Sequence, residues 1–248
     1  MKNVFITSDI HLSHSNIVLH CKRFPWILPN PNFDPSKPKH IKNNYPQLVD
    51  IESHDNDMIQ NWNSIVGKND EVWILGDFAW KRHSHFIMKL NGTKYLIRGN
   101  HDKMDLTSYQ LFAKKGDAHY QYSYYTEIYG KRVMLSHCPY ETWFSSCHGS
   151  WNLHGHCHGR LPEKPEYLRF DVGVDVWGYY PIPWDVIEQK MAEKEKIKKE
   201  FSNSKDHDKD DSNNRIEVEA GESFIHFNET RIKNIELMKN FGVINEKK

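Results

Sequence analysis

Five short apolar segments that each end in polar residues constrain the fold of this chain more than any other feature. The segments are rich in β-branched and aromatic residues, and each stops at Gly or Ser beside Asp, Asn or His. They cover residues 3–9, 70–77, 93–102, 131–140 and 150–159. Runs of this length and composition predict buried strands.

Segments with helical apolar spacing separate these strands. Residues 55–66 and 105–116 have this spacing, and residues 168–178 form a further strand candidate. Strands that alternate with helices indicate an α/β fold.

The segment 24–50 has five prolines between Pro25 and Pro38, which predicts a long surface loop without regular structure. Such a loop is either a lid or binding loop or simple decoration.

The chain changes character after Trp184. Residues 186–201 predict an exposed helix, and residues 202–215 are so polar that they predict a flexible linker. The last segment regains apolar residues that could form a small helical unit: Phe224, Phe227, Ile232, Ile235 and Met238. We therefore expect a catalytic domain over 1–192, a charged helix and linker over 193–215, and a small extension over 216–248. A chain ending near Phe201 is predicted to fold and to keep its activity.

Charge and cysteine content narrow the functional classes. Lys+Arg and Asp+Glu are both 33, which argues against binding nucleic acid by bulk charge but leaves a local basic groove open. The first residues become polar by residue 7, unlike a signal peptide, and no apolar run approaches the ~20 residues of a membrane helix. The lack of such a run predicts no membrane partner, and four cysteines without disulfide-type spacing favour a reducing cytoplasm.

The polar residues at the strand ends form one set. They are Asp9, His11, Asp77, Asn100, His101, Asp102, His137, His156 and His158. In a mostly parallel sheet these ends lie along one edge, where loops build sites. Each motif alone is weak evidence, but their joint occurrence after successive strands is hard to explain by chance.

Asp, His and Asn offer oxygen and nitrogen ligands that suit Mn²⁺, Fe or Zn²⁺. The set is too large for one structural zinc, and no Cys pair has zinc-binding spacing. Seven ligands fit two adjacent ions that share a carboxylate. Such a pair can hold one hydroxide as the nucleophile for hydrolysis of a phosphate ester.

The motifs SDIH, GD, GNHD, LSHCPY and GHCH, in this order, resemble those of the calcineurin-like metallophosphoesterase superfamily. The resemblance covers roughly residues 3–190. It is closer to the small, mostly uncharacterised bacterial and phage phosphoesterases of that superfamily. It implies a double β-sheet sandwich flanked by helices in four layers, to which the C-terminal segment adds a mostly helical extension.

The resemblance also implies a role for each residue of the set. Asp9, His11 and His158 would bind the first metal, Asn100, His137 and His156 the second, and Asp77 would bridge them. His101 would remain unliganded and face the substrate, and Asp102 would orient it. The two divalent ions are expected to be Mn²⁺, with Fe or Zn²⁺ as alternatives.

Other residues near the motifs have two interpretations. His14, Asn16 and Arg98 are candidate substrate contacts, but the first two could cap a helix and Arg98 could form an ordinary ion pair, as could Arg82. His154 is predicted to be structural or to support a ligand. Cys138 and Cys157 are predicted to be packed rather than coordinating.

The motif GDFAWKR lacks the Asp-Arg pair of the family's protein phosphatases, which counts against phosphoprotein substrates. The predicted function is that of a phosphodiesterase acting on a nucleotide-type small substrate. A metal-dependent nuclease and a non-catalytic, metal-stabilised binding module are the alternatives. The expected partner is a phosphorylated small molecule or nucleotide, with nucleic acid as an alternative, and the oligomeric state is left open.

Overall fold

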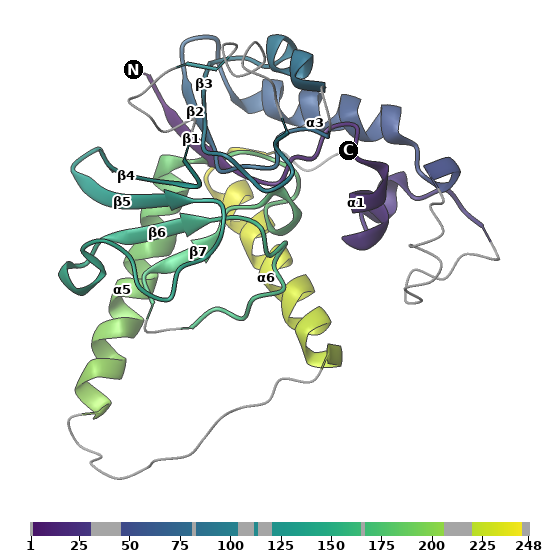
Figure 1. Ribbon diagram of the computed structural model, residues 1–248. Coiled ribbons are helices and arrows are strands. Elements are labelled where there is room, and N and C mark those ends of the chain that lie inside the picture. Colours follow the sequence, from purple (N-terminus) through teal and green to yellow (C-terminus); the bar gives the residue numbers. More distant parts are fainter. Residues whose placement is uncertain are drawn as a thin grey trace.

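The computed structural model describes residues 2–30, 46–80, 83–103, 112–113, 121–164, 167–205 and 220–244. Within these residues the chain forms two mixed four-stranded sheets with helices on their flanks (Figure 1). This architecture confirms the predicted α/β class.

The first sheet has the strand order β3-β2-β1-β8. Its strands are β1 (Val4–Thr7), β2 (Glu71–Ile74), β3 (Thr93–Leu96) and β8 (Ile182–Pro183). The first three are mutually parallel and β8 is antiparallel. The ends of β1, β2 and β3 therefore meet at one edge.

The second sheet has the order β4-β5-β6-β7. Its strands are β4 (Ser123–Ile128), β5 (Lys131–Ser136), β6 (Trp151–His154) and β7 (Arg169–Asp171). β4 and β5 form a hairpin, and β5, β6 and β7 are parallel. A bridge between Ser8 and Gly173 and the hydrogen bond from Val174 N to Ser8 O join the two sheets just beyond β1 and β7.

The α-helices of the described residues lie before β2 and after β8, so they do not follow the predicted strict alternation with the strands. They are α1 (Ser15–His20), α3 (Ile51–Ile65), α5 (Trp184–Lys205) and α6 (Ala220–Asn240). Short 3₁₀ segments are η1 (Phe24–Trp26), η2 (Pro46–Leu48), η3 (His83–Lys89), η5 (Ser146–His148) and η6 (Val174–Val176). Figure 1 shows α3 on one side of the sheets and α5 and α6 on the other.

Strand alternation divides the interior into two cores. Ile6 and Trp73 face the second sheet and pack with its residues and with α5, whereas Phe5 and Val72 face α3. All four strand residues are buried, as expected for parallel strands covered on both faces.

The structure corrects two expectations about individual segments. Helix α5 is not simply exposed, because Val186, Ile187 and Met191 on one of its faces are fully buried. The ends of the proline-rich segment are ordered by a bridge between Ile27 and Val49 and by the hydrogen bond from Leu28 N to Leu48 O. Residues 31–45 lie outside the described residues, so the choice between a lid and decoration remains a prediction.

Two strands, β4 and β8, were not predicted from the sequence. Two predicted segments are only partly covered by the described residues. Most of the predicted helix 105–116 and residues 206–215 of the predicted linker lie outside the described residues, whereas residues 202–205 of that linker continue α5. The predicted boundary between residues 192 and 193 falls inside α5.

Helix α6 packs against the loop that follows β7. Met238 is fully buried in the core that the two sheets share, and Asn234 donates a hydrogen bond to the carbonyl of Val176 at 3.1 Å. We therefore expect removal of α6 to destabilise the catalytic domain, in contrast to the prediction that a chain ending near Phe201 would be unaffected.

Substitution of Met238 by Ala tests this packing. We expect Met238→Ala to lower the free energy of unfolding by about 2–5 kcal/mol, because a buried methionine is replaced by a cavity. Denaturant unfolding of both proteins measures the difference. Ile232→Ala is the control on the same helix, because Ile232 is 57% exposed and should cost less than about 0.5 kcal/mol. Equal effects of the two substitutions would mean that α6 does not contribute to the core.

Among the described residues, no helix combines the length and apolar character that a membrane span requires.

Candidate active site and metal centre

The turns after the strands hold most of the predicted metal ligands in a left-handed backbone conformation. Five of these residues have positive φ angles between 49° and 71°: Asp9, His11, Asp77, His156 and His158. This conformation is uncommon for residues other than glycine and costs about 1–3 kcal/mol each. Its concentration in one set of turns indicates that the surrounding structure imposes it to aim these side chains at a common point.

The glycines of the motifs let these turns approach one another closely. A Cβ atom on Gly99 would overlap the Asp77 backbone and carboxylate. A Cβ atom on Gly155 would overlap the side chains of Ser8 and Asp9. The glycines in GNHD and GHCH are therefore required by packing between the ligand turns.

The first predicted ligand group converges from three turns. His11 Nε2 and His158 Nε2 each lie 3.9 Å from Asp9 Oδ1. Two ligand atoms of one ion lie roughly 3–4 Å apart when each is about 2.0–2.2 Å from the metal. The spacing of these three atoms therefore fits one shared ion.

The second predicted group also converges. His137 Nε2 lies 2.7 Å from Asn100 Oδ1, and His156 Nδ1 lies 3.0 Å from the same oxygen. The two imidazole nitrogens are 3.3 Å apart. His137 is buried, whereas Asn100 and His156 are exposed, so this group lies at the rim of the site.

Asp77 stands between the two groups. Its Oδ2 atom is 3.4 Å from His11 Nε2 and 3.5 Å from His137 Nε2. Its other oxygen accepts the backbone N–H of His101 at 2.8 Å. One carboxylate oxygen thus faces both ligand groups, which is the position that a bridging ligand requires.

Two orphaned atoms support the fit of a metal to the first group. Asp9 Oδ1 and His11 Nε2 are buried, and neither has a hydrogen-bond partner within the part of the chain described. An unpaired buried polar atom is costly, and burial raises the pKa of Asp9 to about 6. A divalent cation at this point would satisfy both atoms and offset the burial of the carboxylate.

The second ring nitrogens orient the histidines. His137 Nδ1 lies 2.8 Å from the Leu75 carbonyl, and His158 Nδ1 lies 2.7 Å from Asp175 Oδ2. A ring N–H donated to such acceptors leaves Nε2 available for a metal. Burial, reinforced by nearby cationic groups, holds the pKa of His11 well below its usual range, so this imidazole is neutral and able to coordinate.

His101 lies above the first group without being part of it. Its ring centroid is 5.6 Å from that of His11, 5.4 Å from that of His14 and 5.5 Å from that of Trp80. The ring is half-buried. This position beside the metal ligands agrees with the predicted place of His101, and its role remains a proposal.

Asp102 lies where the turn after β2 meets the turn after β3. Its carboxylate accepts the backbone N–H groups of Asp77, Phe78 and Gly99 at 2.8, 2.9 and 2.8 Å. These bonds hold the turn after β2 against the turn after β3. Burial and the neighbouring Asp77 raise the pKa of Asp102 to about 6 against the effect of these hydrogen bonds. These contacts indicate that Asp102 also positions Asp77, and the orientation of the His101 ring by Asp102 remains a prediction.

The predicted substrate contacts have varied environments. His14 is buried, its ring stacks on Trp80 at 4.0 Å, and its Nδ1 lies 3.0 Å from His11 Nδ1, so it supports a ligand. It makes no side-chain cap to α1. Asn16 is half-buried in the first turn of α1. The Arg98 guanidinium lies over the Tyr122 ring at 5.6 Å, and its Nε has no partner among the described residues.

Arg82, another possible contact, lies outside the described residues. The remaining expectations concern one histidine and two cysteines beside the candidate ligands. His154 is buried and bonds the Gly155 carbonyl at 3.1 Å, which favours a structural role. Cys157 is half-buried. The prediction that Cys138 is packed is wrong, because Cys138 is exposed and groups with His137 and His156.

Arg23 and Asp175 were not among the predicted site residues. Both are buried and form a bidentate ion pair with two 2.8 Å contacts. Burial alone would raise the pKa of Asp175, but the Arg23 charge and its hydrogen bonds hold that pKa below its usual range. Asp175 follows an apolar run, a signal like that of the ligands, whereas nothing local distinguishes Arg23 from a surface arginine.

Two groups of oxygen and nitrogen ligands around one shared carboxylate are the arrangement of dinuclear metal-dependent hydrolases. The chain belongs to the calcineurin-like phosphoesterase family, whose model matches residues 2–243. It is therefore a metal-dependent phosphoric ester hydrolase, and membership of the family implies a dinuclear divalent metal site.

The chain is similar to an uncharacterised protein of Methanocaldococcus jannaschii, with 28% identity over 207 residues that cover 79% of this chain and 95% of the relative. It is also similar to the Gene 66 protein of Mycobacterium phage L5, with 29% identity over 208 residues that cover 72% of this chain and 89% of the relative. Among solved structures, a protein of unknown function from Aquifex aeolicus, AQ665, matches 76% of this chain and 99% of its own, with 21% identity and a TM-score of 0.49.

Proposed function

We propose that this phosphoesterase hydrolyses a phosphodiester of the nucleotide type. The observation that carries the proposal is the position of Asp77 Oδ2, which lies within 3.5 Å of a histidine nitrogen from each ligand group. Two divalent ions bound there would supply positive charge for the phosphate oxygens and an activated water. Mn²⁺ is the proposed metal, with Fe or Zn²⁺ as alternatives, because the set of Asp, Asn and His ligands suits all three.

The residues of the chain supply the remaining chemistry. His101 would interact with the phosphoryl group and donate a proton to the leaving oxygen, a role supported by its half-buried position near His11 and Trp80. The partly open rim formed by Asn100 and His156 gives the substrate access from solvent.

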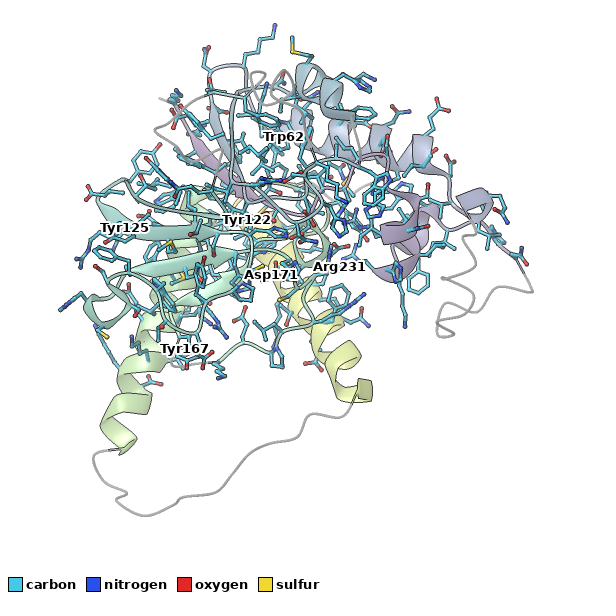
Figure 2. The ribbon with its side chains drawn as sticks, in the orientation of Figure 1. Trp62, Tyr122, Tyr125, Tyr167, Asp171 and Arg231 are labelled. Carbon is cyan, nitrogen blue, oxygen red and sulfur yellow. The ribbon has the colours of Figure 1, made fainter. Side chains whose placement is uncertain are left out.

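Tyr122 supports a substrate that carries a base. Its carbonyl accepts the backbone N–H of His137 at 2.9 Å, so it lies next to a predicted ligand, and its side chain is 51% exposed. Figure 2 shows Tyr122 nearer the centre of the molecule than Tyr125, which lies along β4. An exposed aromatic ring beside Arg98 is a suitable surface for a base to stack on, and the guanidinium can attract an anionic substrate.

We also propose that the protein is cytoplasmic, supported by four cysteines that are all unpaired.

Hydrolysis of a substrate panel tests the proposal. With Mn²⁺, we expect turnover of an aryl phosphodiester and of cyclic or linear dinucleotides to exceed that of the matching monoesters. Tyr122→Ala should raise KM for the nucleotide substrate by about tenfold, because stacking of a base is worth roughly 1–3 kcal/mol. Tyr125→Ala is the matched control and should leave KM unchanged.

Other results would support the alternatives. Cleavage confined to single- or double-stranded nucleic acid would identify a nuclease. Metal binding without hydrolysis of any phosphate ester, with Mn²⁺, Fe²⁺ or Zn²⁺, would favour a non-catalytic binding module. Preference for monoesters would contradict the proposed substrate class.

A further inference from the structure

Arg23 is a fully buried arginine whose five N–H groups all have acceptors. Its Nε and Nη2 atoms donate to the two carboxylate oxygens of Asp175 at 2.8 Å. Nη2 also donates to the Asp9 carbonyl at 2.8 Å, and Nη1 donates to the Ile10 carbonyl at 3.1 Å. Nη1 lies 2.8 Å from His54 Nε2 as well. An arginine has five N–H donors, so this guanidinium has no capacity left for solvent.

The partners of Arg23 belong to the first ligand group. The Asp9 backbone that it holds carries the Asp9 carboxylate. Asp175, which it holds through two bonds, accepts a third bond from His158 Nδ1 at 2.7 Å. His158 Nε2 faces Asp9 Oδ1 from the opposite side of the ring, at 3.9 Å. One guanidinium therefore fixes the relative position of two ligands that come from turns 149 residues apart.

The contacts continue into α3. His54 Nδ1 lies 2.9 Å from Asp55 Oδ1, and Asp55 accepts the backbone N–H of Ser13 at 2.9 Å. Ser13 is two residues beyond His11, the third ligand of the group. The turn that carries Asp9 and His11 is thus held at both ends.

Stability alone does not explain why these charges are buried. Taking an arginine and an aspartate out of water is expensive, and well-packed apolar residues often replace such a pair without loss of stability. The geometry of the contacts offers a different reason. A planar guanidinium donates in fixed directions, which an apolar cluster or a lysine cannot reproduce.

The second ligand group differs from the first in its hydrogen-bonded support and in the burial of its ligands. Within the described part of the chain, none of the hydrogen bonds of Arg23, Asp175 or His54 reaches Asn100, His137 or His156. Two of those three ligands are exposed, whereas Asp9 and His11 are buried. The two groups share Asp77 but differ in the hydrogen bonds that hold their ligands in position.

We propose that Arg23 is a positioning residue that sets the metal affinity of the first group and leaves that of the second unchanged. The first ion is then held tightly, and the second exchanges with the solution. The proposal rests on the same ligand assignment as the proposed function.

Single-site backgrounds test this asymmetry. His156→Ala leaves the first group intact, and His158→Ala leaves the second. In the His156→Ala background, Arg23→Met should weaken Mn²⁺ binding about 10–100-fold, the usual effect of losing a residue that orients a metal ligand. In the His158→Ala background the same substitution should change affinity less than about twofold. Calorimetric titration or the electron spin resonance signal of free Mn²⁺ gives both constants.

Two further variants separate positioning from charge and folding. Arg23→Lys restores a charge opposite Asp175 but not the planar geometry, so first-group affinity should remain well below that of the parent. Arg169→Met is the matched control, because Arg169 is also buried but bonds the Tyr140 carbonyl and Glu141 instead. It should alter neither affinity.

Three results distinguish failure of the Arg23 proposal from failure of the proposed function. Equal weakening of both groups in folded protein, or no weakening of the first, would overturn the proposal. Should Arg23→Met not fold, Asp175→Asn removes the charge with little change of shape and should show the same selective weakening. If His156→Ala or His158→Ala alone still binds two ions, the ligand assignment fails, and with it the proposed function, whatever Arg23 does.

Discussion

Asp77→Ala should release metal from both ligand groups at once. Asp77 Oδ2 faces His11 Nε2 and His137 Nε2, one histidine nitrogen from each ligand group. We expect metal content to fall below one ion per chain after dialysis. Hydrolysis of an aryl phosphodiester should fall at least ~10³-fold, because the lost metals supply several kcal/mol of transition-state stabilisation. Elemental analysis and initial rates measure the two effects.

Asp77→Asn is the matched control for this substitution. The amide keeps an oxygen that can accept the His101 backbone N–H, but it carries no charge to place between two cations. We expect an intermediate metal content and a partial loss of rate. Two tightly bound ions in Asp77→Ala would contradict the bridging assignment.

His101→Ala should reduce the rate while leaving the metals in place. The ring lies over His11 and beside Trp80, yet it is not part of either ligand group. Loss of a general acid that also stabilises phosphoryl charge should lower kcat ~10²–10⁴-fold, equivalent to about 3–5 kcal/mol of barrier. Metal content and thermal stability should match those of the parent protein.

The leaving group distinguishes the two contributions of His101. If proton donation dominates, the loss should be larger for an alkoxide than for nitrophenolate, which departs without a proton. Equal losses would assign His101 to charge stabilisation. The control is His148→Ala, an exposed histidine in η5. Parent rates in His101→Ala on both substrates, with unchanged metal content, would remove His101 from the mechanism.

The strands and the convergence of the candidate ligands could be predicted because one physical signal marks both. An apolar run that ends in Gly beside Asp, Asn or His indicates a buried strand. The turn that follows it must pack tightly and carries a candidate ligand. Gly99 and Gly155 show the reason, since a side chain at either position would overlap Asp77 or Asp9. The convergence of these turns agrees with the expected metal assignments, which the experiments above test.

Contacts between distant segments were not predictable in this way. Arg23 is separated from Asp175 by 152 positions, and its own surroundings in the sequence resemble an exposed segment. The β4–β5 hairpin was missed because its two-residue turn places Tyr129, rather than the usual Asn or Asp, at positive φ before Gly130. The hydrogen bonds that Asp102 accepts from Asp77 and Phe78 in another turn were likewise not predicted.

The pairing at the two ends of the proline-rich segment gives this protein a natural attachment point. Leu28 N donates to Leu48 O, and Asp50 N donates to Trp26 O at 3.0 Å, so residues 26–28 and 48–50 are joined by backbone hydrogen bonds. Because these bonds hold the two flanking segments together, we expect that a change in the number of residues between positions 29 and 47 does not move Arg23 or α3. A reporter or affinity module inserted there should therefore leave the metal centre intact.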